Sequence, residues 1–127
     1  MVLCAVDDLI FSVKIKTAAT GVGAPVFFER NPDMVLARIR EKQPSLVIVD
    51  LNSARMRPLE LIAAMKADPE LRRVPTLGYV SHVQTDVIAA ARTAGVDEVL
   101  ARSAFSERLG EILTSASARP ASREPGE

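Results

Sequence analysis

Three aspartates stand where two unbroken apolar segments end, and their side chains could do acid or metal chemistry. Asp7 and Asp8 directly follow the apolar run at 2–6, and Asp50 follows the run at 46–49. Unbroken runs of valine, isoleucine and leucine are typical of parallel strands covered by helices on both faces. Because ligands bind beyond the carboxyl ends of such strands, we expect the three carboxylates to converge in one acidic pocket.

Converging carboxylates repel one another, and this cost persists in a folded protein only where a cation offsets it or their pKa values rise. Magnesium suits such a site, since it is commonly held by one or two carboxylates together with water and phosphate oxygens. A carboxylate beside such an ion can attack a phosphoryl donor and become an acyl phosphate. The alternative is that Asp7 or Asp8 caps a helix and Asp50 begins a loop. For three aspartates at two strand ends, we favour the functional interpretation.

The segment after Asp50 is basic and could neutralise the same pocket. Residues 51–57 form a polar loop that contains Arg55 and Arg57. Either guanidinium could fold over the carboxylates in place of a cation, or both could be solvated, and the sequence leaves these alternatives open. His82 follows a strand near the same rim, and a lone histidine without partners is expected to be a surface residue.

Around these residues, apolar runs alternate with segments of helical spacing. The sequence predicts strands at 2–6, 24–28, 46–49, 76–80 and 96–101, and helices at 9–20, 32–42, 58–67, 85–94 and 104–115. Ile10, Val13 and Thr17 carry the spacing of the first helix, and Gly95 is expected to cap the fourth. Five strands alternating with five helices imply a doubly wound parallel α/β sheet. We expect one domain at 1–115 and a disordered tail at 116–127, which is small, polar and proline-bearing.

Composition indicates a globular domain in a reducing compartment. Of the 127 residues, 48% are hydrophobic and 25% are charged, and the 16 basic and 16 acidic residues give zero net charge, so no global field attracts nucleic acid or anionic lipid. The only cysteine, Cys4, cannot form an intramolecular disulfide, and the first residues lack the basic leader of a signal peptide. No apolar stretch approaches the roughly 20 residues that span a bilayer. We therefore expect a cytoplasmic protein that binds neither nucleic acid nor membrane.

Three segments resemble response-regulator receiver domains such as the chemotaxis regulators: VLCAVDD, LVIVDLN and RTAGVDEVLARSAF. Together they span the predicted domain. The resemblance implies a flavodoxin-like sheet with strand order 2-1-3-4-5. It also implies that Asp7 and Asp8 hold Mg²⁺ together with Asp50, that Asp50 accepts the phosphoryl group, and that the backbone carbonyl of Asn52 completes the metal shell.

Other positions depart from the receiver pattern. The family usually has threonine or serine at the end of the fourth strand, where this chain has Val80, with Ser81 one residue later. Because strand residues alternate faces, Ser81 could bond a phosphoryl group only from a shifted or bulged strand end. Arg102, followed by Ser103, stands at the family's lysine, and its planar fork is bulkier than an ammonium. Val99 replaces the aromatic switch residue, so the chain resembles a divergent receiver or a pseudo-receiver.

Three functions are compatible with these residues. The first is a non-enzymatic two-component signalling module, phosphorylated at Asp50 by a sensor histidine kinase or phosphotransfer protein, whose face at 85–101 binds a downstream protein or a second copy. The second is a pseudo-receiver that acts as a binding or scaffold domain without phosphorylation, as the changes at 80, 99 and 102 suggest. The third is a small phosphohydrolase, which the short connectors disfavour because they leave no room for a substrate-enclosing cap. We favour the first.

Overall fold

Strands and helices alternate along the chain in the computed structural model, which describes residues 1–81 and 84–118. The strands are β1 (Val2–Ala5), β2 (Val26–Phe28), β3 (Leu46–Asp50), β4 (Thr76–Val80) and β5 (Glu98–Ala101). The helices are α1 (Leu9–Val22), α2 (Val35–Lys42, preceded by the 3₁₀ turn Pro32–Met34), α3 (Pro58–Ala67), α4 (Thr85–Ala94) and α5 (Arg102–Ala118). His82 and residues 119–127 of the predicted tail lie outside the described residues.

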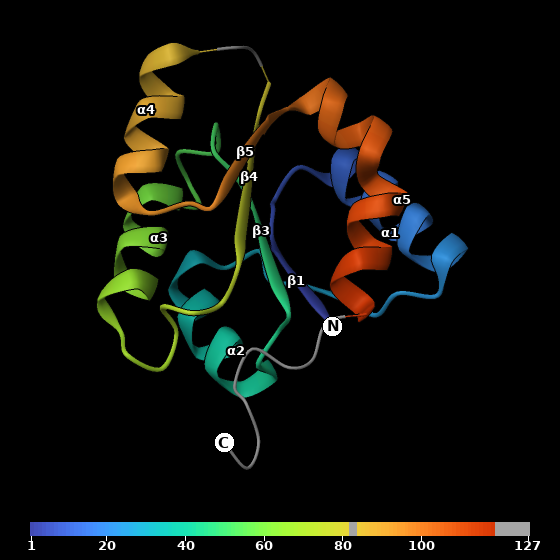
Figure 1. Cartoon of the computed structure of the whole chain (residues 1–127), viewed down its shortest axis with the longest axis horizontal. Helices are drawn as coiled ribbons and strands as arrows, with labels where there is room; N and C mark the ends of the chain where they lie inside the picture. The colour runs from blue at the N-terminus through green and yellow to red at the C-terminus, as the bar shows by residue number, and fades with distance from the viewer. Residues whose placement is uncertain (82–83, 119–127) are drawn as a thin grey trace.

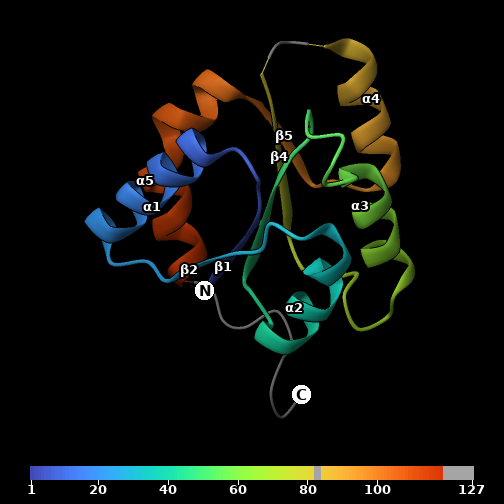
Figure 2. The ribbon, with the colours of Figure 1, turned by 180° about the vertical axis from the view of Figure 1, so that it is seen from behind.

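The strands form one parallel sheet in the order β2-β1-β3-β4-β5. Helices α1 and α5 cover one face of this sheet, and α2, α3 and α4 cover the other, as the two opposite views in Figure 1 and Figure 2 show. The predicted doubly wound, flavodoxin-like fold is therefore confirmed. In the described part of the chain, no helix combines the length and the apolarity needed to cross a membrane.

Strand side chains alternate between two apolar layers. Ile48 and Tyr79 pack toward α1 and α5, whereas Val49 and Val80 pack toward α2, α3 and α4. By the same alternation, the Asp50 side chain lies on the α1 and α5 face, as Ile48 does. The site therefore forms on the face that α1 and α5 cover.

Helix α1 buries a different stripe from the one that its apolar spacing predicts. The side chains of Ile10 and Val13 are 82% and 63% exposed, while Phe11, Ile15 and Ala19 are buried. Positions 11, 15 and 19 also follow the four-residue spacing of one helix face, so the sequence contains two competing stripes. Burial of the large Phe11 ring against other aromatic rings favours the stripe that the structure adopts.

Helix α5 begins directly after β5 and extends beyond its predicted end. It starts at Arg102 rather than at 104, and it continues to Ala118, into the segment predicted as tail. A cation in the first turn of a helix is opposed by the helix dipole. Arg102 therefore needs a nearby anion at this position.

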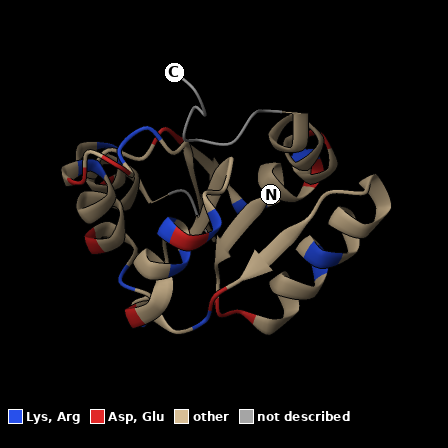
Figure 3. Cartoon of the chain, turned by 90° about the horizontal axis from the view of Figure 1, so that it is seen from below, with Lys and Arg blue, Asp and Glu red and all other residues tan. Residues whose placement is uncertain are grey.

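Charged side chains of both signs are mixed over the surface. Figure 3 shows Lys and Arg interspersed with Asp and Glu on the same elements in that view, rather than separated on opposite sides. This agrees with the zero net charge of the chain. Any electrostatic site must therefore come from a local arrangement.

Candidate functional site

Asp50 is the last residue of β3, and its side chain is only 9% exposed. Its Oδ1 accepts a hydrogen bond of 2.9 Å from the backbone N–H of Asn52, which fixes the carboxylate at the start of the following turn. Burial raises the pKa of this carboxyl, and the nearby charges of Asp7 and Asp8 raise it further, whereas the Asn52 N–H and Arg102 act in the opposite direction. The three aspartates therefore interact electrostatically, as their strand-end positions predict.

Asp8 has two roles at the start of α1. Its Oδ1 accepts the backbone N–H of Phe11 at 3.1 Å, which caps the helix, and its Oδ2 accepts a 2.9 Å hydrogen bond from Nη2 of Arg102. The Arg102 guanidinium also lies over the Phe11 ring, 4.6 Å from the ring centroid. Asp8 therefore caps α1, as the alternative interpretation predicted, and it also forms an ion pair with Arg102.

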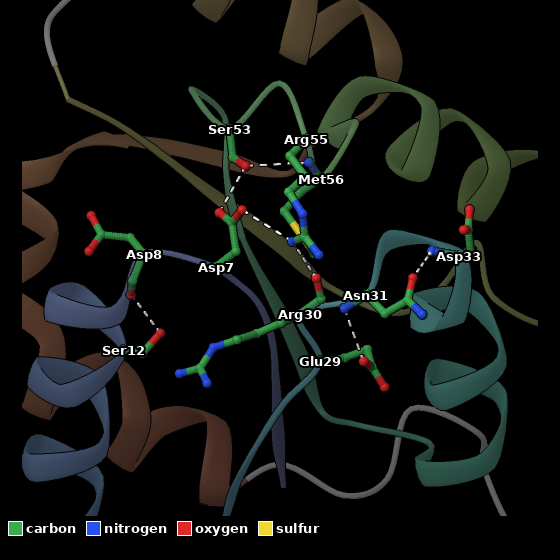
Figure 4. Close-up of polar contacts among 10 residues, drawn as sticks. All are labelled: Asp7, Asp8, Ser12, Glu29, Arg30, Asn31, Asp33, Ser53, Arg55 and Met56. Carbon is green, nitrogen blue, oxygen red and sulfur yellow. Dashed lines mark hydrogen bonds and ion pairs between the residues drawn. The ribbon is translucent and has the colours of Figure 1, made fainter.

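Asp7 faces the loop after β3. Its Oδ1 accepts a 2.9 Å hydrogen bond from Ser53 Oγ, and its Oδ2 lies 3.3 Å from Nη1 of Arg55. The same Arg55 nitrogen donates to the carbonyl oxygen of Arg30 at 2.6 Å. In Figure 4 the Asp7 carboxylate points toward this loop, whereas that of Asp8 points away from it. Asp7 and Asp8, although adjacent in sequence, therefore bind different partners.

The structure distinguishes between the two loop arginines. Arg55 pairs with Asp7, whereas Arg57 pairs with the exposed carboxylate of Asp33, away from the three aspartates. Arg55 is the arginine that folds over the pocket, yet its side chain remains 60% exposed. Arg55 therefore offsets part of the negative charge of Asp7 while its side chain stays largely in contact with solvent.

The donors suit magnesium by type, but they are not arranged as a metal site. Among residues 1–81 and 84–118, no three Asp, Glu, His or Cys side chains are placed to hold one metal ion. Asp7 and Asp8 are already paired with Arg55 and Arg102. Metal binding through Asp7, Asp8, Asp50 and the Asn52 carbonyl stays a prediction, and it requires at least Asp7 to exchange its partner.

Asn52 joins the turn after β3 to the end of β4. Its Oδ1 accepts the backbone N–H of Ser81 at 2.6 Å, and its Nδ2 donates to Oε1 of Gln84 at 2.7 Å. Ser81 is exposed beyond the last residue of the strand, and Val80 is fully buried on the α2, α3 and α4 side. A hydrogen bond from the Ser81 hydroxyl to a phosphoryl group stays a prediction.

Tyr79 is a polar residue of this region that the sequence pattern did not single out, because it lies inside an apolar strand. Its side chain is 1% exposed, and its hydroxyl has no hydrogen-bond partner among the described residues. Leaving a buried hydroxyl unpaired costs about 1–3 kcal/mol. The only signal in the sequence was that this is the one tyrosine of the chain and that it directly precedes Val80.

Solved structures of response regulators share this architecture. The response regulator from Hahella chejuensis matches with a TM-score of 0.82 and 18% identity over 92% of this chain and 94% of its own. The phosphorylated cyanobacterial phytochrome response regulator RcpA matches at 0.75 and 23% identity, over 90% of this chain and 88% of its own. The chain has the receiver-domain fold. The Mn²⁺-bound form of response regulator Rcp1 matches this receiver fold at 0.77 and 17% identity, over 94% and 96% of the two chains.

The resemblance read from the sequence is thus confirmed at the level of the receiver fold. No family model matches the chain, and no curated protein matches it. At identities of 17–23% the likeness to these structures concerns the fold.

If Asp7 holds Mg²⁺ as predicted, Arg55→Ala is expected to increase the affinity for Mg²⁺, because the metal at Asp7 no longer competes with the guanidinium. An exposed ion pair contributes about 0.2–1 kcal/mol, so the dissociation constant should fall by at most about fivefold. Titration with Mg²⁺ by calorimetry measures the change. Arg57→Ala is the matched control, since it removes a guanidinium from the same loop that pairs with Asp33 instead. Equal affinities in both variants and the wild type would show that Arg55 does not compete.

Proposed function

We propose that this chain is a receiver module of a two-component signalling pathway, in which Asp50 accepts a phosphoryl group from a sensor histidine kinase or a phosphotransfer protein. The observation that carries the proposal is the environment of Asp50. A nearly buried carboxylate ends the central strand β3 and interacts with two further acids that follow β1 and a cation from the start of α5. Burial and crowding of like charges are typical of carboxylates at functional sites.

The chemical step requires an ionised Asp50. One carboxylate oxygen attacks the phosphorus atom of the donor and forms a new O–P bond, while the bond from phosphorus to the leaving group breaks and the leaving group departs with the electron pair. The Asn52 N–H holds the other oxygen and favours the charged form. Arg102 supplies positive charge near the phosphoryl oxygens as they arrive.

Magnesium would be held by Asp7, Asp8, Asp50 and the backbone carbonyl of Asn52. When bound, it supplies positive charge for the phosphoryl oxygens. Solved structures of the same fold, one phosphorylated and one with Mn²⁺ bound, support by analogy a site that takes a phosphoryl group and a divalent metal. Arg55 must leave Asp7 for the ion to enter, so metal binding requires Asp7 to exchange its ion pair with Arg55 for a bond to the metal.

A second candidate function is a pseudo-receiver that binds proteins without phosphorylation. The observation that favours it is the pairing of Asp7 with Arg55 and of Asp8 with Arg102, which neutralises both acids by protein cations. Val80 and Val99 add to it, since Val80 has no hydroxyl to bond a phosphoryl group and Val99 has no aromatic ring to act as a switch. In this alternative the pocket has a structural role only.

The two candidates are separated by incubation with acetyl phosphate and Mg²⁺, followed by intact-protein mass spectrometry. A receiver gains the mass of one phosphoryl group, and Asp50→Asn abolishes the gain completely because the amide cannot act as the nucleophile. Asp33→Asn is a matched control, because it removes an exposed carboxylate outside the pocket and should leave the gain unchanged. No gain in the wild type, or an equal gain in Asp50→Asn, would reject phosphorylation at this residue.

A further inference from the structure

Tyr79 carries a hydrogen-bond donor that the described structure leaves unused. Its ring is stacked on Phe105, with centroids 5.0 Å apart and the planes 3° from parallel, and it contacts the Phe11 ring at 4.7 Å. Both rings are themselves buried. These contacts hold the ring in one orientation, which fixes the position of the hydroxyl oxygen, and its hydrogen can rotate toward an acceptor.

Register places Tyr79 beside Asp50. The two residues are direct partners in the pairing of β3 with β4. Partners in a parallel pair point to the same face of the sheet, and Tyr79 packs on the face covered by α1 and α5. The phenol therefore lies on the same side of the sheet as the Asp50 carboxylate, on the adjacent strand.

The surroundings of Tyr79 connect it to the rest of the acidic pocket. Phe11, against which the phenol packs, donates its backbone N–H to Asp8 and lies under the Arg102 guanidinium. Burial, followed by the negative charges of Asp50 and Asp8, raises the pKa of Tyr79 above its ordinary value. The phenol therefore keeps its proton at neutral pH and can donate a hydrogen bond to an acceptor.

We propose that the Tyr79 hydroxyl is a binding group of this site, which donates a hydrogen bond to the phosphoryl group on Asp50. This inference rests on the proposed phosphorylation of Asp50. A phosphoryl group brings strong acceptor oxygens into the pocket and gives the buried donor a partner. The unpaired hydroxyl in the unphosphorylated protein is then a cost that phosphorylation removes.

The neighbouring positions do not supply an equivalent donor. Val80 has no hydroxyl, and it faces the opposite apolar layer. Ser81 lies beyond the end of β4, where it is exposed, and its backbone N–H already donates to Asn52. Among residues 79–81, Tyr79 is the only one with a buried side-chain hydroxyl on the face of Asp50.

The test uses the fact that the chain has one tyrosine and no tryptophan, so its near-ultraviolet absorbance reports on Tyr79. The full chain is treated with acetyl phosphate and Mg²⁺, and separately with beryllium fluoride, which adds to a carboxylate as a phosphoryl mimic. We expect the tyrosine band of the wild type to shift to longer wavelength as the hydroxyl donates to the anion. Tyr79→Phe should bind beryllium fluoride about tenfold more weakly, the effect of losing one hydrogen bond to a charged group.

Ser81→Ala, which removes the other hydroxyl considered for this role, is compared directly with Tyr79→Phe, and we expect it to bind beryllium fluoride more tightly than Tyr79→Phe does. Thermal unfolding of the untreated variants provides a second control, because Tyr79→Phe removes an unpaired hydroxyl and should not lower the melting temperature. A wild type that is phosphorylated without any change in the tyrosine band, and with unchanged affinity in Tyr79→Phe, overturns this inference alone. Weaker binding by Ser81→Ala than by Tyr79→Phe would assign the donor to Ser81 instead. If the wild type forms no acyl phosphate and binds no beryllium fluoride, the proposed function fails and the inference fails with it.

Discussion

Asp50→Asn is expected to stabilise the protein near neutral pH by about 1 kcal/mol, a magnitude within the usual range for a single substitution. The amide fills the same space and still accepts the N–H of Asn52, while the buried negative charge and its repulsion by Asp7 and Asp8 are removed. Urea denaturation of both proteins measures the difference. The difference in unfolding free energy then measures how much the ionised Asp50 carboxylate destabilises the wild type.

The pH dependence of this gain has a definite sign. The pKa of Asp50 is raised in the folded state, so its contribution to stability is fully present below the unfolded-state pKa, about 3.9, and is lost as the pH rises through the folded-state value. The advantage of Asp50→Asn should therefore be absent below about pH 4 and reach its full size near neutrality. A constant difference at all pH values would contradict the assignment of the raised pKa to Asp50.

Asp68→Asn provides a control of opposite sign. The backbone N–H of Glu70 and the Arg40 guanidinium lower the pKa of Asp68, so its stabilising contribution is present above the unfolded-state pKa and is lost as the pH falls through the folded-state value. We expect this variant to be less stable than the wild type near neutral pH and equal to it in acid. Opposite trends for the two variants exclude a general effect of removing one carboxylate.

Gly78→Ala is expected to destabilise the fold by about 1–3 kcal/mol, because it overpacks a buried strand. A Cβ atom at Gly78 would lie 2.6 Å from Cδ1 and 2.7 Å from Cγ of Leu51. Leu51 is itself buried and donates its backbone N–H to the carbonyl of Tyr79 at 3.0 Å, so it has little room to move. Because Leu51 directly follows Asp50, the strain should also weaken the proposed phosphorylation of Asp50.

Gly21→Ala is the control for this substitution. Gly21 lies in α1, and a Cβ atom there would meet nothing within 4 Å. Alanine at an exposed helical position is expected to stabilise the protein by about 0.5–1 kcal/mol. Thermal and urea unfolding of the two variants should therefore change in opposite directions. Equal stability of Gly78→Ala and the wild type would show that Leu51 yields at no cost.

Sequence alone predicted the positions of the three aspartates, because these depend only on where apolar strands end. The sheet brings the ends of β1 and β3 together, and Asp50 consequently interacts with Asp7 and Asp8. The cap at Gly95 was equally predictable, since its backbone adopts φ 112, which glycine tolerates best. In both cases a local rule determines the result.

The partners of the charged residues could not be predicted, because they depend on loop conformation and on contacts distant in sequence. Spacing did not distinguish Arg55 from Arg57, and only the folded loop directs the first toward Asp7. The buried face of α1 depended on which of two stripes met the aromatic rings, so Ile10 was misplaced. Tyr79 gained importance only through its register with Asp50.

The hydrogen bond between Arg102 and Asp8 joins residues that are 94 positions apart in the chain. As a ribosome makes the protein from the amino terminus, all three aspartates therefore exist well before Arg102 has been added. Until then the growing chain carries an acidic strand edge without its main cation from α5, and contacts between such distant segments form late because of their entropic cost. Completion of the pocket is thus tied to synthesis of the segment that begins α5, and a nascent chain that stalls before β5 has the three aspartates without Arg102.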